Sequence, residues 1–416
     1  MRADTMTITR VLHITPTVRL LGARRSLLAL VNELAGTRYE PIVAVPSTGA
    51  ITDELDKRRL RWCLLPASPW RKGLAWLRIP SEVRAMRAFI RKENIGLIHC
   101  NEIYPNPHAL VAASRGGLAA ECASTFMMKR PLHPLRIPVV THMRLSVTPK
   151  LVRNYLLEHA TRIIAVSHGA AADFDGFTWK DRKVRVVHNG VDFGPFERAA
   201  ARRAEIRRRL GYSPDDFVIG QIGLLMPRKR PMFLINALPE ILNLAPNVRV
   251  LFVGAASPGQ DSYVTQLQRR AEELKVADRI QWIPFQDSVA EFFAALDLNV
   301  LLSNDEGFGR VIIEAGAVGV PTIGSDVGGI PEVIEDGVTG YVLGPRNCPD
   351  AQFDTLTTGF AHLVYGLASD PSLRMAMGNA AHDRAHTLFS TPHYAAGVTH
   401  VFDEAMEEHR RNQPPW

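Results

Sequence analysis

The sequence predicts an α/β protein made of two doubly wound domains that face a central cleft. Short runs rich in β-branched residues alternate with helical stretches along almost all of its 416 residues, which is the pattern of a parallel sheet covered by helices. The runs are apolar without alternation, so we expect both faces of each sheet to be buried. A pause in this alternation divides the chain into halves of similar size.

The predicted strands follow one another with a turn or a helical stretch between them. In the first half they span residues 8–15, 40–46, 61–66, 96–101, 138–143, 162–167 and 184–189. In the second half they span residues 217–223, 248–254, 279–284, 298–303, 320–325 and 340–343. The clearest helical patterns span residues 24–35, 81–92, 231–244 and 262–275. These helices supply the covering layers that a parallel sheet needs.

The domain boundary is expected within residues 188–200, where Asn-Gly and Gly-Pro turns interrupt the alternation. We therefore expect an N-terminal domain over residues 1–190 and a C-terminal domain over residues 191–390. The last amphipathic segment, residues 391–412, can pack back on the first domain. Residues 116–138 place about 20 residues between a helix and the next strand, and so long a loop is usually functional or disordered.

The composition is that of a soluble globular protein. Hydrophobic residues make up 46% and charged residues 22% of the chain, which excludes a disordered, collagenous or coiled-coil architecture. The N-terminal segment does not read as a signal peptide, and there is no apolar run of about 18 residues. The cysteines are widely spaced and match neither a disulfide framework nor zinc-ligand spacing. These features predict a cytoplasmic protein.

The charge is unevenly distributed. Residues 1–185 contain 29 Lys and Arg against 14 Asp and Glu, whereas the remainder contains 20 against 28. A basic half beside an acidic half suggests that the two domains meet different partners; a well-solvated basic face is the alternative. No nucleic-acid motif accompanies the basic half.

Aromatic and basic residues are interleaved in the N-terminal half, which suggests peripheral contact with the inner face of a membrane. The residues are Lys57, Arg58, Arg59, Arg61, Trp70, Arg71, Lys72, Leu74, Trp76, Leu77 and Arg78, with Phe126, Met127, Met128, Lys129 and Arg130 in the long insertion. The alternative is that Trp70 and Trp76 belong to the core and that the charges form a solvated face.

The most specific signal lies within residues 303–321. A strand ends at Ser303, residues 306–309 form a glycine-containing turn, and a helix is expected over residues 311–318. The free N–H groups at the start of such a helix favour a phosphate. Glu314 lies in an apolar helix, where a carboxylate is costly unless ligand hydroxyls, the backbone or an Arg bond it. Were Glu306 on the same helix, the two would lie about 80° apart around its axis.

Several short motifs follow one another at a defined spacing: Glu306-Gly307-Phe308-Gly309, Glu314, Gly319-x-Pro321 and Gly328-Gly329-x-x-Glu332. In this pattern the chain resembles family 4 of the retaining nucleotide-sugar glycosyltransferases, which have the two-Rossmann-domain GT-B fold. The resemblance extends over nearly the whole chain, with further matching pieces at residues 166–174, 187–196 and 335–343. It implies that Glu306 contacts the transferred sugar and that Glu314 contacts the ribose hydroxyls. The amides of Phe308 and Gly309 would lie near the sugar and the diphosphate.

Residues 220–233 resemble the family's diphosphate-binding loop, in which an Arg and a Lys neutralise the leaving group. Lys229 matches the Lys and is expected as an exposed loop cation. The Arg that usually follows the glycine is Leu224 here. Arg228 or Arg230 is the candidate for the second positive charge.

In the first domain, the loop that contains Gly22 resembles the one that reaches the donor phosphates, although the family commonly has two glycines there. His142 lies near the end of the strand at 138–143 and matches the family's active-site His, at the edge where open α/β sheets bind ligands. The weaker candidates are His13, His99, Asn101 and Arg144, and His188 is expected only to mark the boundary.

We expect neither a metal ion nor a cofactor. No Asp-x-Asp follows a strand, no His, Cys or carboxylate cluster has metal spacing, and no Gly-x-Gly-x-x-Gly of the NAD type follows the first strand. Lys229 and the helix N-terminus would then balance the leaving-group charge.

The resemblance implies a retaining transferase that moves a sugar from a nucleotide diphosphate sugar to an acceptor hydroxyl, with no protein nucleophile. A lipid-linked glycan or surface-polysaccharide precursor is the acceptor considered. One alternative is another nucleotide-sugar enzyme on the same fold, such as an epimerase or a sugar-phosphate synthase. The other is a non-catalytic nucleotide-sugar-binding scaffold, which Leu224 and the single glycine at Gly22 make conceivable.

Overall fold

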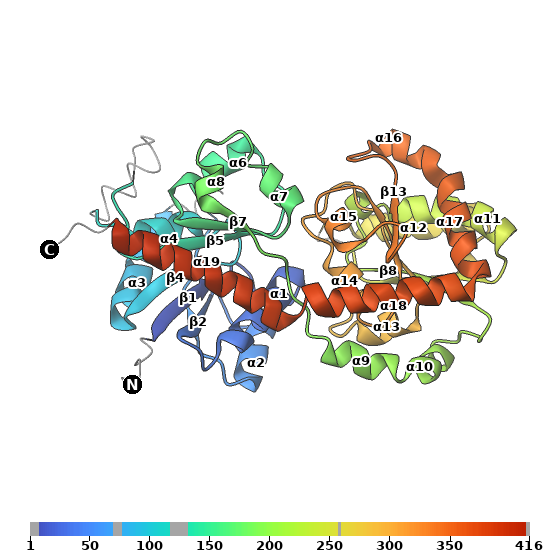
Figure 1. The fold of residues 1–416 in the computed structure, drawn as a ribbon, viewed down its shortest axis with the longest axis horizontal. Coiled ribbons are helices and arrows are strands. Elements are labelled where there is room, and N and C mark those ends of the chain that lie inside the picture. The colour runs from blue at the N-terminus through green and yellow to red at the C-terminus, as the bar shows by residue number, and fades with distance from the viewer. Residues whose placement is uncertain (1–7, 70–76, 117–131, 257–258, 413–416) are drawn as a thin grey trace. The chain divides into compact units, whose positions relative to one another are not determined.

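The computed structural model describes residues 8–69, 77–116, 132–256 and 259–412. The chain divides into two compact units, one formed by residues 1–190 with residues 391–416 and the other by residues 191–390. Each unit is a parallel sheet covered by helices (Figure 1). The predicted α/β class with two doubly wound domains is therefore confirmed.

The described sheet of the first unit has the strand order β3-β2-β1-β4-β5-β6-β7, with every pairing parallel. The strands are β1 (Thr9–Ile14), β2 (Tyr39–Val45), β3 (Trp62–Leu64), β4 (Ile95–Cys100), β5 (Val139–Met143), β6 (Arg162–Ala165) and β7 (Val184–Val186). Each lies where the sequence predicts a strand. The order reverses between β1 and β4, and such switch points are where open α/β sheets bind ligands at the carboxyl ends of their strands.

Helices cover both faces of this sheet. They are α1 (Gly22–Leu34), α2 (Ala50–Lys57), α3 (Ile79–Lys92), α4 (Asn106–Ala113), α6 (Pro149–Asn154), α7 (His168–Ala172), α8 (Lys180–Lys183) and α19 (Thr391–Arg411). The C-terminal helix α19 runs across the sheet beside α1 (Figure 1). Its Tyr394, Val398 and Phe402 are buried against Val11 of β1 and Leu97 of β4. Burying each such side chain contributes about 1.5–3 kcal/mol.

The second unit repeats this architecture. Its described sheet has the order β10-β9-β8-β11-β12-β13 and is again parallel throughout. The strands are β8 (Phe217–Ile222), β9 (Val248–Val253), β10 (Ile280–Ile283), β11 (Leu298–Leu301), β12 (Thr322–Ser325) and β13 (Gly340–Leu343). The switch point lies between β8 and β11.

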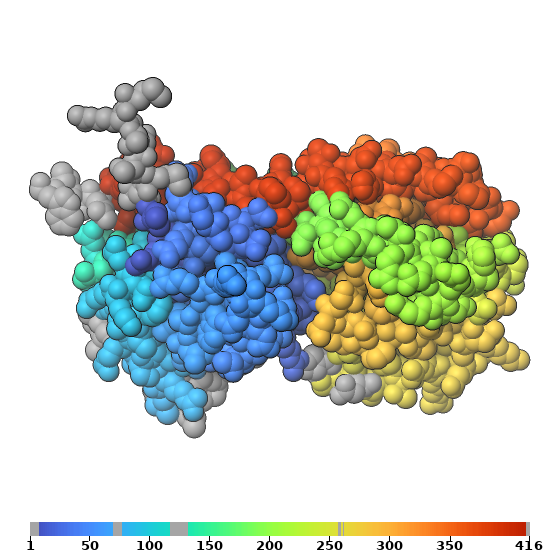
Figure 2. Space-filling model, turned by 90° about the horizontal axis from the view of Figure 1, so that it is seen from below, coloured from blue at the N-terminus to red at the C-terminus, as the bar shows by residue number. Residues whose placement is uncertain are grey.

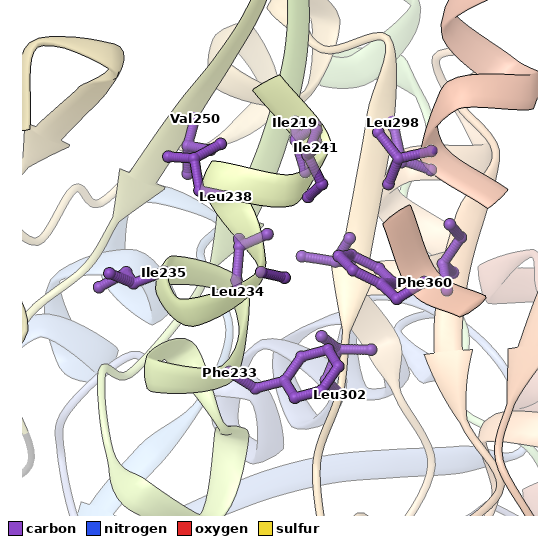
Figure 3. Close-up of a cluster of buried hydrophobic side chains, with 14 of the residues drawn as sticks. Ile219, Phe233, Leu234, Ile235, Leu238, Ile241, Val250, Leu298, Leu302 and Phe360 are labelled. Carbon is purple, nitrogen blue, oxygen red and sulfur yellow. The ribbon is translucent and has the colours of Figure 1, made fainter. Parts of the chain in front are cut away.

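The helices of the second unit are α9 (Gly194–Ala200), α10 (Arg203–Arg209), α11 (Pro231–Leu244), α12 (Asp261–Glu273), α13 (Ala290–Ala295), α14 (Arg310–Gly316), α15 (Ile330–Val333), α16 (Asp350–Phe353), α17 (Thr357–Ser369) and α18 (Pro371–Leu388). Helix α11 packs on the sheet through Leu234, Leu238 and Ile241, which meet Leu298 of β11 and Phe360 of α17 (Figure 3). This core holds the ends of β8 and β11 in fixed positions.

Helices α9 and α10 lie on the surface of the second unit next to α13 (Figure 2). Two arginines of α10 anchor it to the residue before β11, because Arg203 and Arg207 donate to the Asp297 carboxylate at 2.8 and 2.7 Å. Within the described ranges, none of the helices combines the length and the apolar character needed to cross a bilayer.

Candidate active site

The switch point of the second unit brings together the two loops that carry its charged candidates. The loop after β8 leads into a short 3-10 helix, Pro227–Lys229, and the loop after β11 carries Glu306. The Lys229 ammonium Nζ lies 3.4 Å from Glu306 Oε2. The Ser303 hydroxyl donates to the same carboxylate oxygen at 3.2 Å. A cation and a carboxylate predicted from separate motifs thus meet at the edge where such sheets bind ligands.

The prediction that Lys229 is an exposed loop cation is wrong. Its side chain is 14% exposed and that of Glu306 is 17% exposed. The reason is local geometry: the Gln221 amide donates to the Lys229 carbonyl at 2.7 Å, and Nζ lies 3.7 Å from where a Cβ on Gly223 would stand. A Cβ at Gly223 would make only an ordinary van der Waals contact with the ammonium, so the burial of Lys229 follows from its held backbone and its ion pair with Glu306.

The neighbouring arginines have different roles in the fold. Arg230 is buried, donates to the Asp350 carboxylate at 2.6 and 2.8 Å, and lies over the Phe353 ring. It therefore anchors the start of α11 to α16. Arg228 donates to the Asp305 carbonyl and links the two loops. Leu224 stands where the family usually has an Arg that neutralises the leaving group. Of the two arginines, Arg228 remains the candidate to supply that positive charge.

At two positions of the motif, the backbone geometry explains why the residue is glycine. Gly309 precedes α14 with φ +95°, a conformation that residues with a Cβ rarely adopt. Gly328 has φ +52°, and a Cβ there would stand 1.7 Å from the Glu306 carbonyl oxygen. The amide of Gly329 donates to that oxygen at 3.3 Å. The Gly-Gly turn thus supports the backbone of Glu306.

Glu314 lies buried in α14 and forms an ion pair with Arg310, one turn before it, whose Nε donates to Glu314 Oε1 at 2.7 Å. Sequence reasoning left an Arg partner open but did not identify Arg310. The spacing of four residues on a helix was the signal that could have found it.

In the first unit, His142 is the last residue but one of β5 and is completely buried. Two of the weaker candidates lie beside it. His99 Nε2 is 3.4 Å from His142 Nδ1, and His13 Nδ1 is 2.9 Å from His99 Nδ1. The parallel register pairs His13 of β1 with His99 of β4, so the side chains share one face of the sheet. The rings of Tyr394 and Phe402 from α19 pack against them.

Arg144 joins this cluster to the neighbouring loops. Its guanidinium donates to Asn101 Oδ1 at 2.7 Å, to Asn189 Oδ1 at 2.5 Å and to the Tyr394 hydroxyl at 3.0 Å. Asn101 Nδ2 in turn donates at 3.2 Å to the carbonyl of Ala23, at the start of α1. Sequence reasoning missed Asn189 and Tyr394, which are far from Arg144 along the chain.

Gly22 is the first residue of α1. A Cβ there would meet no atom within 4 Å, so packing within the protein does not require glycine at this position. His188 packs its ring against that of His168. Of the aromatic and basic residues singled out in the N-terminal half, those within 70–76 and 126–130 lie outside the described residues, as does most of the insertion.

Burial makes the histidine cluster sensitive to acid. It lowers the pKa of His13 to about 3. Burial is also the main reason why the pKa values of His99 and His142 lie well below the ordinary value. The positive charge of Arg144 lowers both pKa values further. All three imidazoles are therefore neutral near pH 7.

We expect acid to destabilise the first unit. A group whose pKa is lower in the folded chain binds fewer protons when folded, so its stabilisation is complete above the unfolded value of 6.5 and is lost as the pH falls toward the folded value. The free energy of unfolding should fall by about 1.4 kcal/mol per pH unit for each such imidazole. Urea unfolding at about pH 7.5 and about pH 5.5 measures this.

The His13→Asn variant is the control, since its amide keeps a hydrogen-bond donor but does not titrate. Its free energy of unfolding should decrease less steeply with acid than that of the wild type. Equal decreases in the two proteins would contradict this account of the cluster.

Across the described ranges, no group of three or more His, Cys, Asp or Glu side chains is arranged to hold a metal ion.

Comparison with known families and proteins agrees with this geometry. Residues 202–382 match the family model of glycosyl transferases group 1, and residues 21–194 match that of glycosyltransferase family 4. The chain is 34% identical to the D-inositol 3-phosphate glycosyltransferase of Streptomyces bingchenggensis over 234 residues, which are 55% of this chain and 49% of that protein. The chain thus spans about half the length of this relative.

Two further similarities extend over more of the chain. N-acetyl-alpha-D-glucosaminyl L-malate synthase of Bacillus anthracis is 27% identical over 332 residues, which are 79% of this chain and 80% of that protein. The crystal structure of Anabaena HepE in complex with UDP and glucose superposes with a TM-score of 0.76 at 21% identity, over 95% of this chain and 100% of that chain. With one family model on each unit and this fold, the chain belongs to glycosyltransferase family 4, which has the GT-B fold.

Proposed function

We propose that the protein is a retaining glycosyltransferase that moves a sugar from a nucleotide diphosphate sugar to an acceptor hydroxyl. The observation that carries the proposal is the pairing of Lys229 with Glu306 at the switch point of the second unit. A diphosphate leaving group gains negative charge as its bond to the sugar breaks, and a fixed cation stabilises that charge in the transition state.

The other site residues take complementary roles in this proposal. Arg228 adds a second positive charge on the leaving group, and the amides of Phe308 and Gly309 approach the sugar and the diphosphate. Glu306 accepts hydrogen bonds from the sugar hydroxyls, and Glu314 accepts them from the ribose. In the first unit, Gly22 permits close approach of the donor phosphates, and His142 contacts the sugar.

The relatives indicate which ligands to test first. The HepE structure contains UDP and glucose, so uridine nucleotides and UDP-glucose lead the list of donors. The names of two relatives point to small anionic acceptors, an inositol phosphate and malate. An anionic acceptor suits the excess of Lys and Arg in residues 1–185.

A thermal-shift screen of nucleoside diphosphates and their sugars tests the donor site. A ligand that binds only the folded state raises the melting temperature, and at about 100 times its Kd it adds about 2.7 kcal/mol of stability. One nucleotide series should raise the melting temperature well above the others. No shift with any series at millimolar ligand would contradict the proposal.

We expect transfer to be independent of metal ions, because Lys229 and Arg228 supply the positive charge that a metal would otherwise supply. The rate in excess chelator should equal the rate without it. Transfer that stops in chelator and returns with magnesium would show that the diphosphate requires a metal.

Peripheral association with the inner face of the membrane is part of the proposal, with a lipid-linked acceptor. Leu64 and Leu77 are more than half exposed in the described part of the first unit. Among the nearby cations, Lys57 pairs with Glu54 and Arg61 pairs with Glu40 and Glu93. Each Lys or Arg near an anionic membrane surface contributes about 1 kcal/mol of attraction. These ion pairs reduce that attraction, because the acidic partners offset the positive charge.

Sedimentation with anionic and neutral vesicles, at low and high salt, tests this association. The protein should sediment with anionic vesicles at low salt and be released by salt. The Leu64→Ser, Leu77→Ser variant should bind less. Equal recovery in the supernatant with both lipids at low salt would reject membrane association and leave a soluble anionic acceptor.

A further inference from the structure

The buried histidines form a chain of hydrogen bonds that ends at an arginine. Helix α19 covers one face of the first unit's sheet (Figure 1). His13, His99 and His142 lie on that face, where the rings of Tyr394 and Phe402 pack against them. Nδ1 of His13 lies 2.9 Å from Nδ1 of His99, and Nε2 of His99 lies 3.4 Å from Nδ1 of His142. Arg144 Nη2 lies 3.4 Å from the same Nδ1 of His142.

A neutral imidazole has one N–H and one acceptor nitrogen, so only two proton arrangements satisfy both histidine–histidine bonds. In the first, His142 keeps its proton on Nε2, His99 donates through Nε2, and His13 donates through Nδ1. In the second, every proton lies on the opposite nitrogen, and His142 donates from Nδ1.

Arg144 distinguishes the two arrangements. A guanidinium has N–H donors and no acceptor, and it stays charged. Facing it, Nδ1 of His142 must offer a lone pair, which only the first arrangement provides. The two N–H groups of Nη2 have nearer acceptors in Asn101 Oδ1, at 2.7 Å, and the Tyr394 hydroxyl, at 3.0 Å, so the contact with His142 Nδ1 is a shared one, at 3.4 Å. The positive charge beside Nδ1 nevertheless disfavours a proton on that nitrogen, because its N–H would point at the guanidinium.

The guanidinium is held so that it cannot turn away. Nε donates to the Asn101 carbonyl at 3.0 Å, Nη1 donates to Asn189 Oδ1, and Nη2 donates to Asn101 Oδ1 and to the Tyr394 hydroxyl. Asn101 is itself fixed, because its backbone amide donates to the Ile14 carbonyl at 2.9 Å. All three nitrogens of the guanidinium therefore have an acceptor.

We propose that Arg144 is a positioning residue that fixes the tautomers of all three histidines, so that His142 presents Nε2–H as a hydrogen-bond donor. Nε2 of His142 is buried and has no partner among the described residues. A buried N–H without an acceptor is costly, and a ligand oxygen would remove that cost. His142 then acts as a donor to an oxygen of the bound sugar and not as a base. This last step rests on the proposed function, whereas the tautomers do not.

Nitrogen NMR of protein labelled with ¹⁵N in its histidines tests the tautomers directly, because protonated and unprotonated ring nitrogens give well-separated signals. Signals are assigned by their loss in His13→Asn, His99→Gln and His142→Gln. We expect the proton on Nε2 of His142 and His99 and on Nδ1 of His13. A proton on Nδ1 of His142 would overturn the proposal.

The role of Arg144 is tested with two variants in the same experiment. Arg144→Met removes the donor that faces His142, and a population with the proton on Nδ1 of His142 should appear. Tyr394→Phe is the matched control, since it removes another partner of the guanidinium and should leave the tautomers unchanged. Unchanged tautomers in Arg144→Met would overturn the role of Arg144. If that variant does not fold, the wild-type spectrum still decides the arrangement.

Kinetics test the link to sugar transfer. The Gln side chain can place an N–H near the position of Nε2, so His142→Gln should retain more of the wild-type kcat/KM than His142→Ala. Loss of the donor should cost up to about tenfold, the value of one neutral hydrogen bond. Equal losses in both variants would refute the donor role. Absence of transfer in the wild type would refute the proposed function and leave the NMR result intact.

Discussion

Replacing Lys229 by alanine should lower kcat for sugar transfer by about 100- to 1,000-fold, the range measured when one stabilising donor is removed from a transition state. The loss should fall mainly on kcat and less on the KM for the acceptor, since the charge on the diphosphate develops as the bond breaks. Steady-state kinetics with the donor found by thermal shift measure both constants.

Two controls separate this role from a structural one. Lys229→Arg keeps the charge and should retain more activity than Lys229→Ala. Because Lys229 is largely buried beside Glu306, we also expect Lys229→Ala to lower the free energy of unfolding by about 1–3 kcal/mol, so activity is measured on protein shown to be folded. A kcat within tenfold of the wild type would make Lys229 a structural partner of Glu306 only.

Glu314→Ala should weaken nucleotide-sugar binding by about 10- to 150-fold, because hydrogen bonds to a charged group contribute about 1.5–3 kcal/mol. The carboxylate is buried in α14, and its Oε1 accepts from Arg310. In the proposal, the ribose hydroxyls donate to this carboxylate as well. Calorimetric titration of the folded variant measures the change in affinity.

Arg310→Met is the matched control for Glu314→Ala. It breaks the same ion pair, at 2.7 Å, and leaves the carboxylate in place. Both variants should lose stability, but we expect Arg310→Met to keep its nucleotide affinity, because the carboxylate that binds the ribose in the proposal is still present. If Glu314→Ala also keeps its affinity, Glu314 serves only to pair with Arg310.

The sheets could be predicted from the sequence because their signals are local. Uninterrupted apolar runs such as residues 248–254 and 298–303 are buried on both faces, and each became a strand. The turn at Glu306–Gly309 was equally readable, because its glycines include one with positive φ. A backbone conformation with positive φ favours glycine, so such a position can be recognised in the sequence itself.

The environment of the side chains could not be predicted in this way. Arg144 and Tyr394 meet across 250 positions of the chain, and no local pattern records that contact. His13, His99, Asn101 and Arg144 are only weak candidates in the sequence, because no local pattern shows that the β1–β4–β5 register brings them together beside His142. The exposure of Lys229 was misjudged for the same reason, because its partner Glu306 lies on another loop, far from Lys229 in the sequence.

The most direct test of the proposed function is product analysis by NMR of the protein incubated with its donor and with candidate acceptor alcohols. We expect nucleoside diphosphate to be released together with a new glycoside whose anomeric configuration is that of the donor sugar. An inverted glycoside would contradict retention. Release of an epimerised sugar would indicate the epimerase alternative, and transfer to a sugar phosphate would indicate the synthase alternative. Tight donor binding with neither transfer nor hydrolysis, whatever acceptor is supplied, would contradict the central claim and leave a nucleotide-sugar-binding scaffold.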